Sequence, residues 1–372
     1  MAKKILCIHQ GYELYGSDRS FITSLAAFRS EYPDGEINVY IPKKGVLYDY
    51  LLKLGYSVSI QDIAKISKED IIKLRFKKLL KPIQSIRRIS REVKSYDMVY
   101  INTIVILDYI FSSFFFKPKC IIHVREIPTG ILKAISKIVL SASGAHLIFN
   151  SRATRKVFDK TGNKRNYLLY NGVKPFSDVE MPRNGSFRLL IIGRLIPWKG
   201  QLFALEAIGK YRKLLPKSVS LRILGSVFED QKEYYEMLKD RVRKYQLEGI
   251  VEFVEFVDDP SEHYEWCNIL LVPSTKPEPF GRIAIEAMGV GRPVIAANHG
   301  GLPEIVIHRK TGLLFEPRNM YALVAAIKEL TDGSVNMQEY GLNGKKRFNE
   351  QFNEDIYHKN FRMIVKDIMK SD

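Results

Sequence analysis

Residues 272–305 read VPSTKPEPFGRIAIEAMGVGRPVIAANHGGLPEI, and the rest of the chain can be placed around them. An apolar strand ends at Val272 and is followed by a loop with three prolines. We expect a helix to open near Gly281, a second strand to run over Pro293–Ala296 and a Gly-Gly turn to follow. Strand, helix and strand in close succession indicate a unit of parallel sheet.

Two carboxylates flank the start of that helix, Glu278 in the loop and Glu286 eight residues later on the helix. The first N–H groups of a helix lack partners within it and carry a partial positive charge. The backbone around Phe280, Gly281 and Arg282 therefore suits a phosphate. Carboxylates only accept hydrogen bonds, which suits sugar hydroxyls. The segment predicts a pocket for a nucleotide sugar; surface carboxylates in a proline-rich loop are the alternative.

The same residues resemble the GT4 family of retaining glycosyltransferases, whose signature has the form E-x-F-G-x-x-x-x-E-A-M. Residues 278–288 here read EPFGRIAIEAM. The resemblance implies that Glu286 binds the ribose hydroxyls of the nucleotide and that Glu278 contacts the transferred sugar. It also implies the α/β architecture called GT-B, in which two Rossmann-like doubly wound domains face a central cleft.

A second motif, IIGRLIPWKGQ, occupies residues 191–201. It reads as a strand, a turn with a glycine and a helix starting near Lys199, which again makes a phosphate cradle. Arg194 and Lys199 are spaced to clamp a diphosphate, although solvated loop charges are the commoner case for a single cation. The motif resembles the diphosphate-binding motif of the GT4 family, which favours the functional interpretation.

Two further candidates lie in the first half of the chain. The loop GYELYGSDRSF (11–21) follows the first strand, with Ser17 as a candidate N-cap of the next helix. It resembles the family's acceptor-side loop and implies that Gly16 approaches the donor phosphates, although such turns are common in Rossmann-like domains. His123 in HVREIP ends a strand and is a candidate partner for a sugar hydroxyl, with a purely structural role as the alternative. Arg125 and Glu126 beside it are placed to reach acceptor or donor.

Short apolar strands alternate with helical segments along the whole chain, as in a doubly wound parallel sheet. The expected strands are Ile5–Ile8, Ile37–Ile41, Val58–Ile60, Met98–Ile101, Cys120–His123, His146–Phe149 and Tyr167–Tyr170 in the first half, and Arg188–Ile192, Ser220–Leu224, Val251–Phe253, Ile269–Val272, Pro293–Ala296 and Gly312–Phe315 in the second. A polar segment, Asp178–Gly185, suggests a linker.

We therefore expect an acceptor-binding domain over residues 1–180, a nucleotide-sugar-binding domain over 181–350 and a final segment over 351–372. The tail carries a helical stripe of apolar residues, and the resemblance implies that this last helix crosses back to the first domain.

The composition limits the kinds of partner and the cellular compartment that can be expected for this protein. The 372 residues carry a net charge of +17, which indicates an anionic partner such as nucleic acid, a phospholipid surface or a phosphorylated substrate. Cys7, Cys120 and Cys267 lie in or beside apolar segments and are expected to be reduced and buried, as in a cytoplasmic protein. The N-terminal apolar run is too short for a signal peptide, and no segment is predicted to span a membrane.

Residues 73–94, KLRFKKLLKPIQSIRRISREVK, hold nine basic residues against one acid, Glu92. Six leucines and isoleucines provide apolar contacts, and Pro82 is expected to divide the segment into two helices. A basic amphipathic segment suits an anionic bilayer, and a solvated helix face packed on the sheet is equally compatible. The GT4 resemblance favours the membrane, because many members use lipid-linked acceptors. We expect docking on the inner face of the cell membrane.

The sequence thus predicts a retaining hexosyltransferase that uses a nucleoside diphosphate sugar, UDP-linked rather than GDP-linked, and a saccharide or lipid-linked acceptor. The expected catalytic residues are Arg194, Lys199, Glu278 and His123, with no metal. A nucleotide-sugar epimerase or hydrolase on the same fold is one alternative. The other is a nucleic-acid-binding protein, disfavoured because the basic residues do not interleave with aromatic ones.

Overall fold

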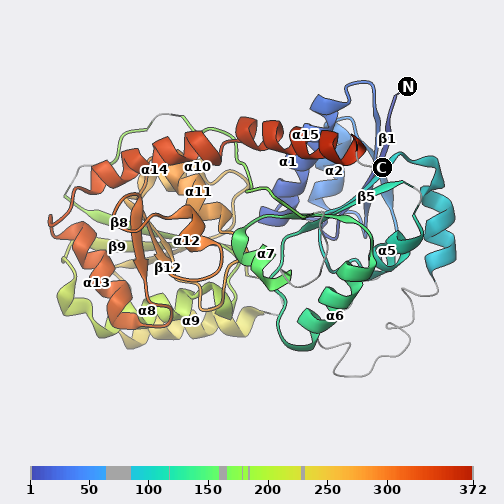
Figure 1. Ribbon diagram of the computed structural model, residues 1–372. Coiled ribbons are helices and arrows are strands. Elements are labelled where there is room, and N and C mark those ends of the chain that lie inside the picture. Colours follow the sequence, from blue (N-terminus) through green and yellow to red (C-terminus); the bar gives the residue numbers. More distant parts are fainter. Residues whose placement is uncertain are drawn as a thin grey trace. The chain divides into compact units, whose positions relative to one another are not determined.

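The computed structural model describes residues 2–63, 85–116, 118–158, 166–177, 179–182, 185–227 and 231–370. The chain divides into two compact units (Figure 1). Unit 1 comprises Met1–Gly172 together with Glu354–Asp372, and unit 2 comprises Val173–Asn353. The linker predicted over Asp178–Gly185 falls partly outside the described residues.

Unit 1 is built on a seven-stranded parallel sheet with the strand order β3-β2-β1-β4-β5-β6-β7. The strands are β1 (Lys4–Ile8), β2 (Glu36–Ile41), β3 (Ser57–Ile60), β4 (Met98–Ile101), β5 (Lys119–Val124), β6 (His146–Phe149) and β7 (Asn166–Leu168). All seven strands predicted for this half are confirmed. They are apolar along their length because both faces of a parallel sheet are covered by helices.

The helices of unit 1 divide between the two faces of this sheet. Side chains of a strand alternate between faces, so Leu6 and Ile8 join one core and Ile5 and Cys7 the other. The helical residues 85–92, α5 (Leu107–Ser112), α6 (Gly130–Ala142) and α7 (Arg152–Phe158) are associated with the first core, and the 3₁₀ turn η2 (Ser113–Phe115) directly follows α5. The second core is covered by α1 (Gly16–Glu31), α2 (Val46–Lys53) and the C-terminal helix α15 (Glu354–Lys370).

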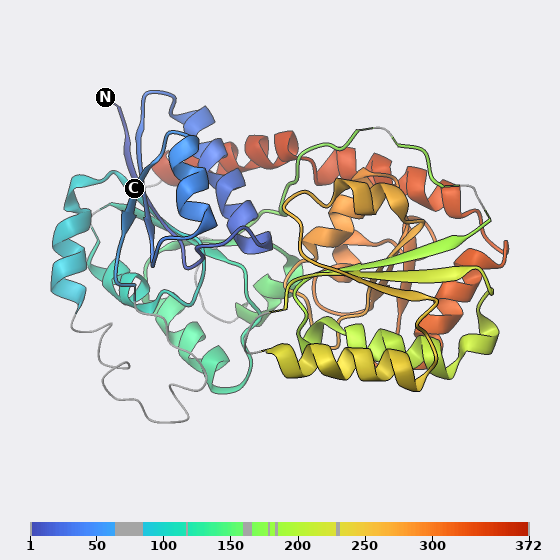
Figure 2. The same ribbon diagram turned by 180° about the vertical axis from the view of Figure 1, so that it is seen from behind.

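The C-terminal helix α15 packs against α1, beside which it lies in Figures 1 and 2. Phe361 meets Phe28 edge to face with 4.8 Å between ring centroids. The Tyr357 hydroxyl lies 2.7 Å from Ser24 Oγ. The stripe predicted for the tail thus serves as part of the core of unit 1.

Unit 2 holds a six-stranded parallel sheet with the order β10-β9-β8-β11-β12-β13. Its strands are β8 (Phe187–Ile192), β9 (Val219–Leu224), β10 (Val251–Val254), β11 (Ile269–Val272), β12 (Val294–Ala297) and β13 (Gly312–Phe315), and the six predicted strands are confirmed. One face packs against α8 (Gln201–Lys210), α9 (Lys232–Lys244) and α13 (Met320–Thr331). Figure 1 shows α10 (Ser261–Trp266), α11 (Arg282–Gly289) and α14 (Met337–Gln351) on the opposite side from α8 and α9.

Three details extend or correct the sequence prediction. The N-cap of α1 is Tyr15, not Ser17, because the Asp18 carboxylate accepts the Tyr15 backbone N–H at 2.9 Å and draws the helix start toward it. The cysteines are free and buried as predicted, and burial raises the pKa of Cys120 and Cys267 to about 12. In the part of the chain that the structure describes, no helix has the length and apolar character to cross a membrane.

Candidate active site

The candidate site in unit 2 follows from the strand order. β8 and β11 are neighbours in the sheet, and the order reverses between them. In such sheets ligands bind at the carboxyl ends of the strands where the order reverses. The two predicted motifs follow these two strands, so residues about eighty positions apart in sequence meet at one edge of the sheet. The backbone N–H of Thr275 donates to the carbonyl of Trp198 at 2.8 Å and joins the two loops.

The joined loops bring Lys199 and Glu278 into contact. The Lys199 ammonium lies 2.8 Å from Glu278 Oε1, and both side chains are largely buried. The Ser274 hydroxyl donates to the same carboxylate oxygen at 2.6 Å. A charge-assisted pair in a largely buried setting holds both groups in place. The structure thus brings together the cation predicted for the diphosphate and the carboxylate predicted for the sugar.

Glu286 is held by two other groups. Arg282 Nε lies 2.8 Å from Glu286 Oε1 one turn earlier on α11, and the Tyr264 hydroxyl donates to Oε2 at 2.7 Å. Tyr264 is fully buried, and burial together with the Glu286 charge raises its pKa well above the ordinary value. A neutral phenol therefore donates to Glu286, and the carboxylate keeps a defined orientation.

The helix start between the two carboxylates lies where it was predicted. Gly281 precedes the first residue of α11, Arg282, and Phe280 is buried against Phe352. The Glu278 backbone is pressed against Gly300, whose φ is +61° and whose position leaves no space for a Cβ atom. Only glycine fits this approach without strain. The Gly-Gly turn thereby supports the loop that carries Glu278.

The helix start and the arginine that were predicted to act with Lys199 differ from it in position and exposure. Lys199 ends the 3₁₀ turn η3 (Pro197–Lys199), and α8 begins two residues later at Gln201, because Gly200 adopts a left-handed conformation. Arg194 lies on the same loop with an exposed side chain, and its carbonyl accepts a hydrogen bond from the Gln201 side chain at 3.0 Å. The two predicted cations therefore share one loop, one buried in an ion pair and one exposed.

Unit 1 has its own polar edge, where its strand order reverses between β1 and β4. His123, next to the end of β5, is fully buried, and its Nδ1 lies 2.8 Å from the Tyr100 hydroxyl. Burial and the neighbouring Arg125 charge lower the pKa of His123 well below its ordinary value. Gly16 is the first residue of α1, in the loop after β1. Glu126 receives hydrogen bonds from Thr103 and two backbone N–H groups, so its carboxylate braces the loop.

Several side chains at these edges were not predicted. Tyr264 and Ser274 contact the carboxylates of unit 2, and His9, Asp18 and Asn102 belong to the network around His123. His9 and Asn102 directly follow β1 and β4, the same position that singled out His123. That signal was available in the sequence. Tyr264 lies on α10 and has no such signal.

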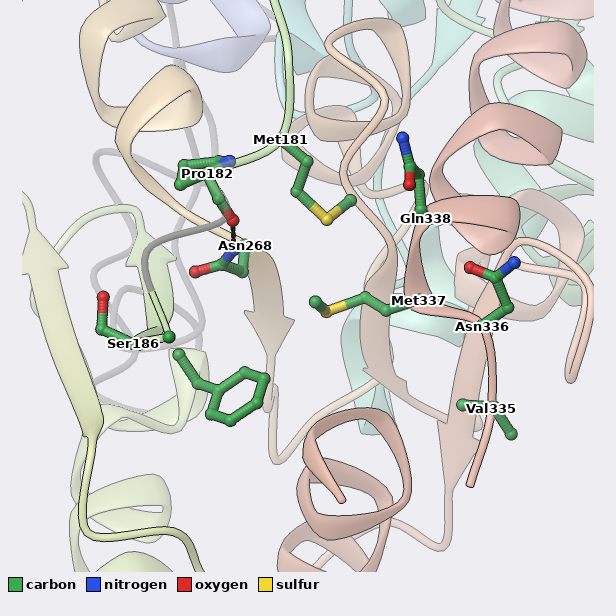
Figure 3. Close-up of a pocket in the computed structure, with 10 residues that line it drawn as sticks. Met181, Pro182, Ser186, Asn268, Val335, Asn336, Met337 and Gln338 are labelled. Atoms are coloured by element: carbon green, nitrogen blue, oxygen red, sulfur yellow. Dashed lines mark hydrogen bonds between the residues drawn. The ribbon is translucent and has the colours of Figure 1, made fainter. Parts of the chain in front are cut away.

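A shallow pocket elsewhere in unit 2 does not belong to this site. Figure 3 shows it between Met181, Met337 and Asn268, whose side-chain amide donates to the Pro182 carbonyl at 2.8 Å. Asn268 precedes β11 and Phe187 begins β8, so the pocket lies at the amino ends of the strands. The length of both strands separates it from Glu278 and Lys199.

Among the residues that the structure describes, no three or more histidines, cysteines or carboxylates are grouped so that they could hold a metal ion.

Comparison with solved structures defines the class of fold. The chain is similar to Anabaena Alr3699/HepE in complex with UDP and glucose, with a TM-score of 0.82 and 22% identity over 98% of this chain and 100% of that one. It is also similar to sucrose-phosphate synthase from Thermosynechococcus elongatus, with a TM-score of 0.77 and 19% identity over the full length of both chains. The protein has the GT-B fold of two Rossmann-like α/β domains.

Sequence comparison finds a family match in unit 2. Residues 175–347 match the family model of glycosyl transferases group 1. The chain is 34% identical to the Dictyostelium discoideum alpha-1,3/1,6-mannosyltransferase ALG2 over 36% of this chain and 32% of that protein. It is 31% identical to glycogen synthase of Mycobacterium tuberculosis over 50% of this chain and 44% of that protein. The matches thus span a third to a half of these relatives, and the GT4-like resemblance is confirmed.

Proposed function

We propose that the protein is a retaining glycosyltransferase that moves a hexosyl unit from a nucleoside diphosphate sugar to a saccharide or lipid-linked saccharide. The observation that carries this proposal is the edge of unit 2 where Lys199, Glu278 and Glu286 surround the start of α11. That edge combines a cation and helix N–H groups for a diphosphate with two carboxylates for hydroxyls.

The negative charge of the leaving diphosphate explains the role of the cations at this site. When the bond between the anomeric carbon and the diphosphate breaks, negative charge grows on the phosphate oxygen. Arg194, Lys199 and the N–H groups around Phe280, Gly281 and Arg282 stabilise that charge. The acceptor oxygen then bonds to the same face of the anomeric carbon, and its proton passes to the phosphate oxygen. Because Lys199 is paired with Glu278 at 2.8 Å, donor binding exchanges one anionic partner of this lysine for another.

The other residues have binding roles. Glu286 accepts the ribose hydroxyls and Glu278 accepts a hydroxyl of the transferred sugar. Their anchoring by Tyr264 and Ser274 supports these roles, because an acceptor with a defined orientation loses little freedom on binding. His123 contacts a hydroxyl of the sugar, and Gly16 approaches the phosphates. A UDP-sugar is the favoured donor, supported by the UDP in the Anabaena structure.

Thermal unfolding with a panel of UDP- and GDP-sugars tests the donor. A ligand held at a hundred times its dissociation constant stabilises the protein by about 2.7 kcal/mol. Glu286→Gln is the matched variant and should lose about half of this stabilisation. Stabilisation by none of the sugars would contradict the proposal. Release of nucleoside diphosphate without any acceptor dependence would favour a hydrolase.

We also propose that unit 1 docks on an anionic membrane that carries the acceptor. Part of the basic segment 73–94 lies outside the described residues. In its described part, Ile89 and Val93 are buried in the core of unit 1, while Arg87, Arg88 and Arg91 are exposed. The same core anchors α6. Both helices therefore cover one face of the sheet and present their outer sides together.

The outer side of that layer is apolar as well as basic. Ile131 and Ile138 on α6 are 52% and 70% exposed, and Phe114 and Phe115 on η2 are 63% and 57% exposed. Besides the buried Arg125, residues 109–158 contain seven basic residues and a single acid, Glu126, whose carboxylate accepts hydrogen bonds from unit 1 itself. Exposed apolar groups beside basic ones fit the boundary of an anionic bilayer, at about 1 kcal/mol per basic residue near the surface. A second copy of the chain would meet like charge.

Liposome sedimentation tests the docking. The protein should sediment with vesicles of phosphatidylglycerol and phosphatidylcholine and be released by salt. Replacing Arg87, Arg88 and Arg91 by Ser, or Phe114 and Phe115 by Ser, should weaken binding. In unit 2 the controls Lys213, Arg243 and Lys244 to Ser, and Leu342→Ser, should not. Equal recovery in the supernatant with anionic and neutral vesicles at low salt would refute docking and leave the glycosyltransferase proposal intact.

A further inference from the structure

The carboxyl edge of the unit 1 sheet contains a buried cation held only by neutral groups. Arg125 is 8% exposed. Its Nε donates to Asn102 Oδ1 at 2.8 Å, its Nη1 donates to Asn171 Oδ1 at 2.5 Å, and its Nη2 lies 3.2 Å from His123 Nδ1. Among the described residues, no carboxylate lies within hydrogen-bond distance of the Arg125 guanidinium, and from Arg125 the Glu126 carboxylate accepts only the backbone N–H, at 3.1 Å. A buried guanidinium without a paired anion is uncommon and calls for a reason.

The guanidinium determines the proton position on His123. Arginine has only N–H donors, so His123 Nδ1 must accept the bond from Nη2. The ring is neutral, since burial and the Arg125 charge both oppose protonation. A neutral imidazole whose Nδ1 accepts carries its proton on Nε2. The Nε2 atom is buried and has no hydrogen-bond partner among the described residues.

The same cation orients the rest of the network. Asn102 Oδ1 accepts from Arg125 Nε, which turns the Asn102 amide nitrogen toward His9 Nδ1 at 3.0 Å. His9 Nδ1 therefore accepts, and His9 donates through Nε2 to Asp18 at 2.7 Å. Asp18 in turn accepts the Tyr15 N–H and fixes the loop before α1. Gly11 packs so closely on Asp18 and His9 that no Cβ atom would fit there.

We propose that Arg125 is a positioning residue that fixes His123 as a neutral Nε2–H donor, so that His123 gives a hydrogen bond to a ligand oxygen and does not act as a base. The inference rests on the proposed function and adds that, in the hydrogen bond between His123 and the ligand, the enzyme supplies the donor. An unpartnered buried donor costs free energy, and a ligand oxygen that accepts from it removes that cost. Because no carboxylate hydrogen-bonds to the Arg125 guanidinium, its charge favours a ligand oxygen with negative character, such as a phosphate or a sugar hydroxyl that loses its proton.

Other titratable groups belong to the network around His123. Tyr100 on β4 and Tyr357 on α15 are buried phenols whose pKa values are raised by burial, so both are neutral. Arg125 lies beyond the end of β5, and the carboxylate of Asp18 on α1 is reached only through His9 and Asn102. The Glu126 carboxylate accepts from Thr103 and from two backbone N–H groups and has no hydrogen bond to the ring. The Tyr100 hydroxyl, 2.8 Å from Nδ1, can donate to it, so none of these groups requires a proton on Nδ1. The tautomer therefore depends on Arg125.

Nuclear magnetic resonance of the full chain with ¹⁵N-labelled histidine rings tests the inference without any activity. The signals of His123 are assigned as those missing from His123→Asn. The unliganded wild type should show an unprotonated Nδ1 and a protonated Nε2, unchanged between about pH 6 and 8. A proton on Nδ1, or a charged ring at pH 7, would overturn the inference whether or not the protein transfers sugar.

Variants of Arg125 sharpen the test. Arg125→Met and Arg125→Lys both lose the planar fork, so the His123 signals should shift toward the other tautomer, and turnover should fall about a hundredfold as the contact is misplaced. The exposed Arg155→Met is the matched control. Unchanged His123 signals in a folded Arg125→Met would overturn the inference. If the variants do not fold, the wild-type spectrum decides. Absence of transfer by the wild type with every donor would refute the proposed function alone.

Discussion

The two units share a parallel sheet covered by helices, yet they differ in charge. Unit 1 carries 33 basic and 18 acidic residues, and unit 2 carries 25 and 23. Nearly all of the net charge of +17 therefore belongs to unit 1. The excess suits a surface contact with an anion, since fold alone would not require it.

The polar edges of the two sheets also differ, in the kind of group that holds their cations. In unit 2 two cations near the site, Lys199 and Arg282, have carboxylate partners, Glu278 and Glu286, both at 2.8 Å. In unit 1 the buried Arg125 is held by amides, a hydroxyl and a neutral imidazole. In unit 2 a bound anion can replace the carboxylate partner of a cation. In unit 1 the neutral groups around Arg125 keep their positions and leave one donor without a partner, Nε2 of His123.

The largest effect is expected from the cations of unit 2. Lys199→Ala and Arg194→Ala should each lower kcat by about a hundredfold to a thousandfold, with a smaller change in donor affinity, because they meet charge that grows in the transition state. Steady-state kinetics with the donor identified by thermal unfolding measures both constants. Lys213→Ala, an exposed lysine of the same unit, is the control. If both variants change only KM, these residues bind the ground state and the proposed role is wrong.

A smaller effect should follow from loss of the Glu286 charge. Glu286→Gln should weaken binding of the free nucleoside diphosphate by about tenfold, or about 1.4 kcal/mol, because ribose contacts form before the chemical step. Isothermal titration calorimetry with UDP and GDP measures this directly. Glu339→Gln, an exposed carboxylate on α14, should bind as the wild type does. Unaltered affinity in Glu286→Gln would remove Glu286 from the ribose site.

The burial of His123 beside Arg125 in unit 1 should make the free energy of unfolding depend on pH. The pKa of His123 is lowered in the folded state by burial and Arg125, whereas in the unfolded chain it is about 6.5. Below about pH 6.5 the unfolded state therefore binds one more proton. The free energy of unfolding should fall with decreasing pH by up to about 1.4 kcal/mol per unit from this group.

Urea denaturation between pH 5 and 8 measures that slope. His123→Asn should show a shallower decline below pH 6.5, and the exposed His308→Asn should keep the wild-type slope. An equal slope in wild type and His123→Asn would mean that His123 is not held neutral by the fold.

The smallest effect is expected from chelation. Turnover should be unchanged in EDTA, because the cations and helix N–H groups of unit 2 hold the diphosphate. Metal-free buffer without chelator is the control. Loss of turnover in EDTA, restored by magnesium or manganese, would show that the leaving group needs more charge than Arg194 and Lys199 supply.

Much of the fold could be predicted from the sequence. Every predicted strand is present, because strands buried on both faces of a parallel sheet are short apolar runs bounded by glycine, proline and polar residues. The helix at Gly281 was readable from its glycine and the apolar spacing that follows. Two helix starts were predicted less accurately, each by two residues. A carboxylate contact moves the N-cap of α1 from the predicted Ser17 to Tyr15, and a left-handed glycine moves the start of α8 from Lys199 to Gln201.

The sequence by itself determined which chemical groups the site contains, because a motif such as EPFGRIAIEAM places two carboxylates and a helix start within eleven residues. Only the tertiary structure decided how they are paired. Lys199 meets Glu278 because β8 and β11 are neighbours in the sheet, and Tyr264 reaches Glu286 from another helix. Arg125 joins Asn102, His123 and Asn171 across three strand ends. Such contacts depend on strand order and side-chain direction, which local patterns along the chain do not contain.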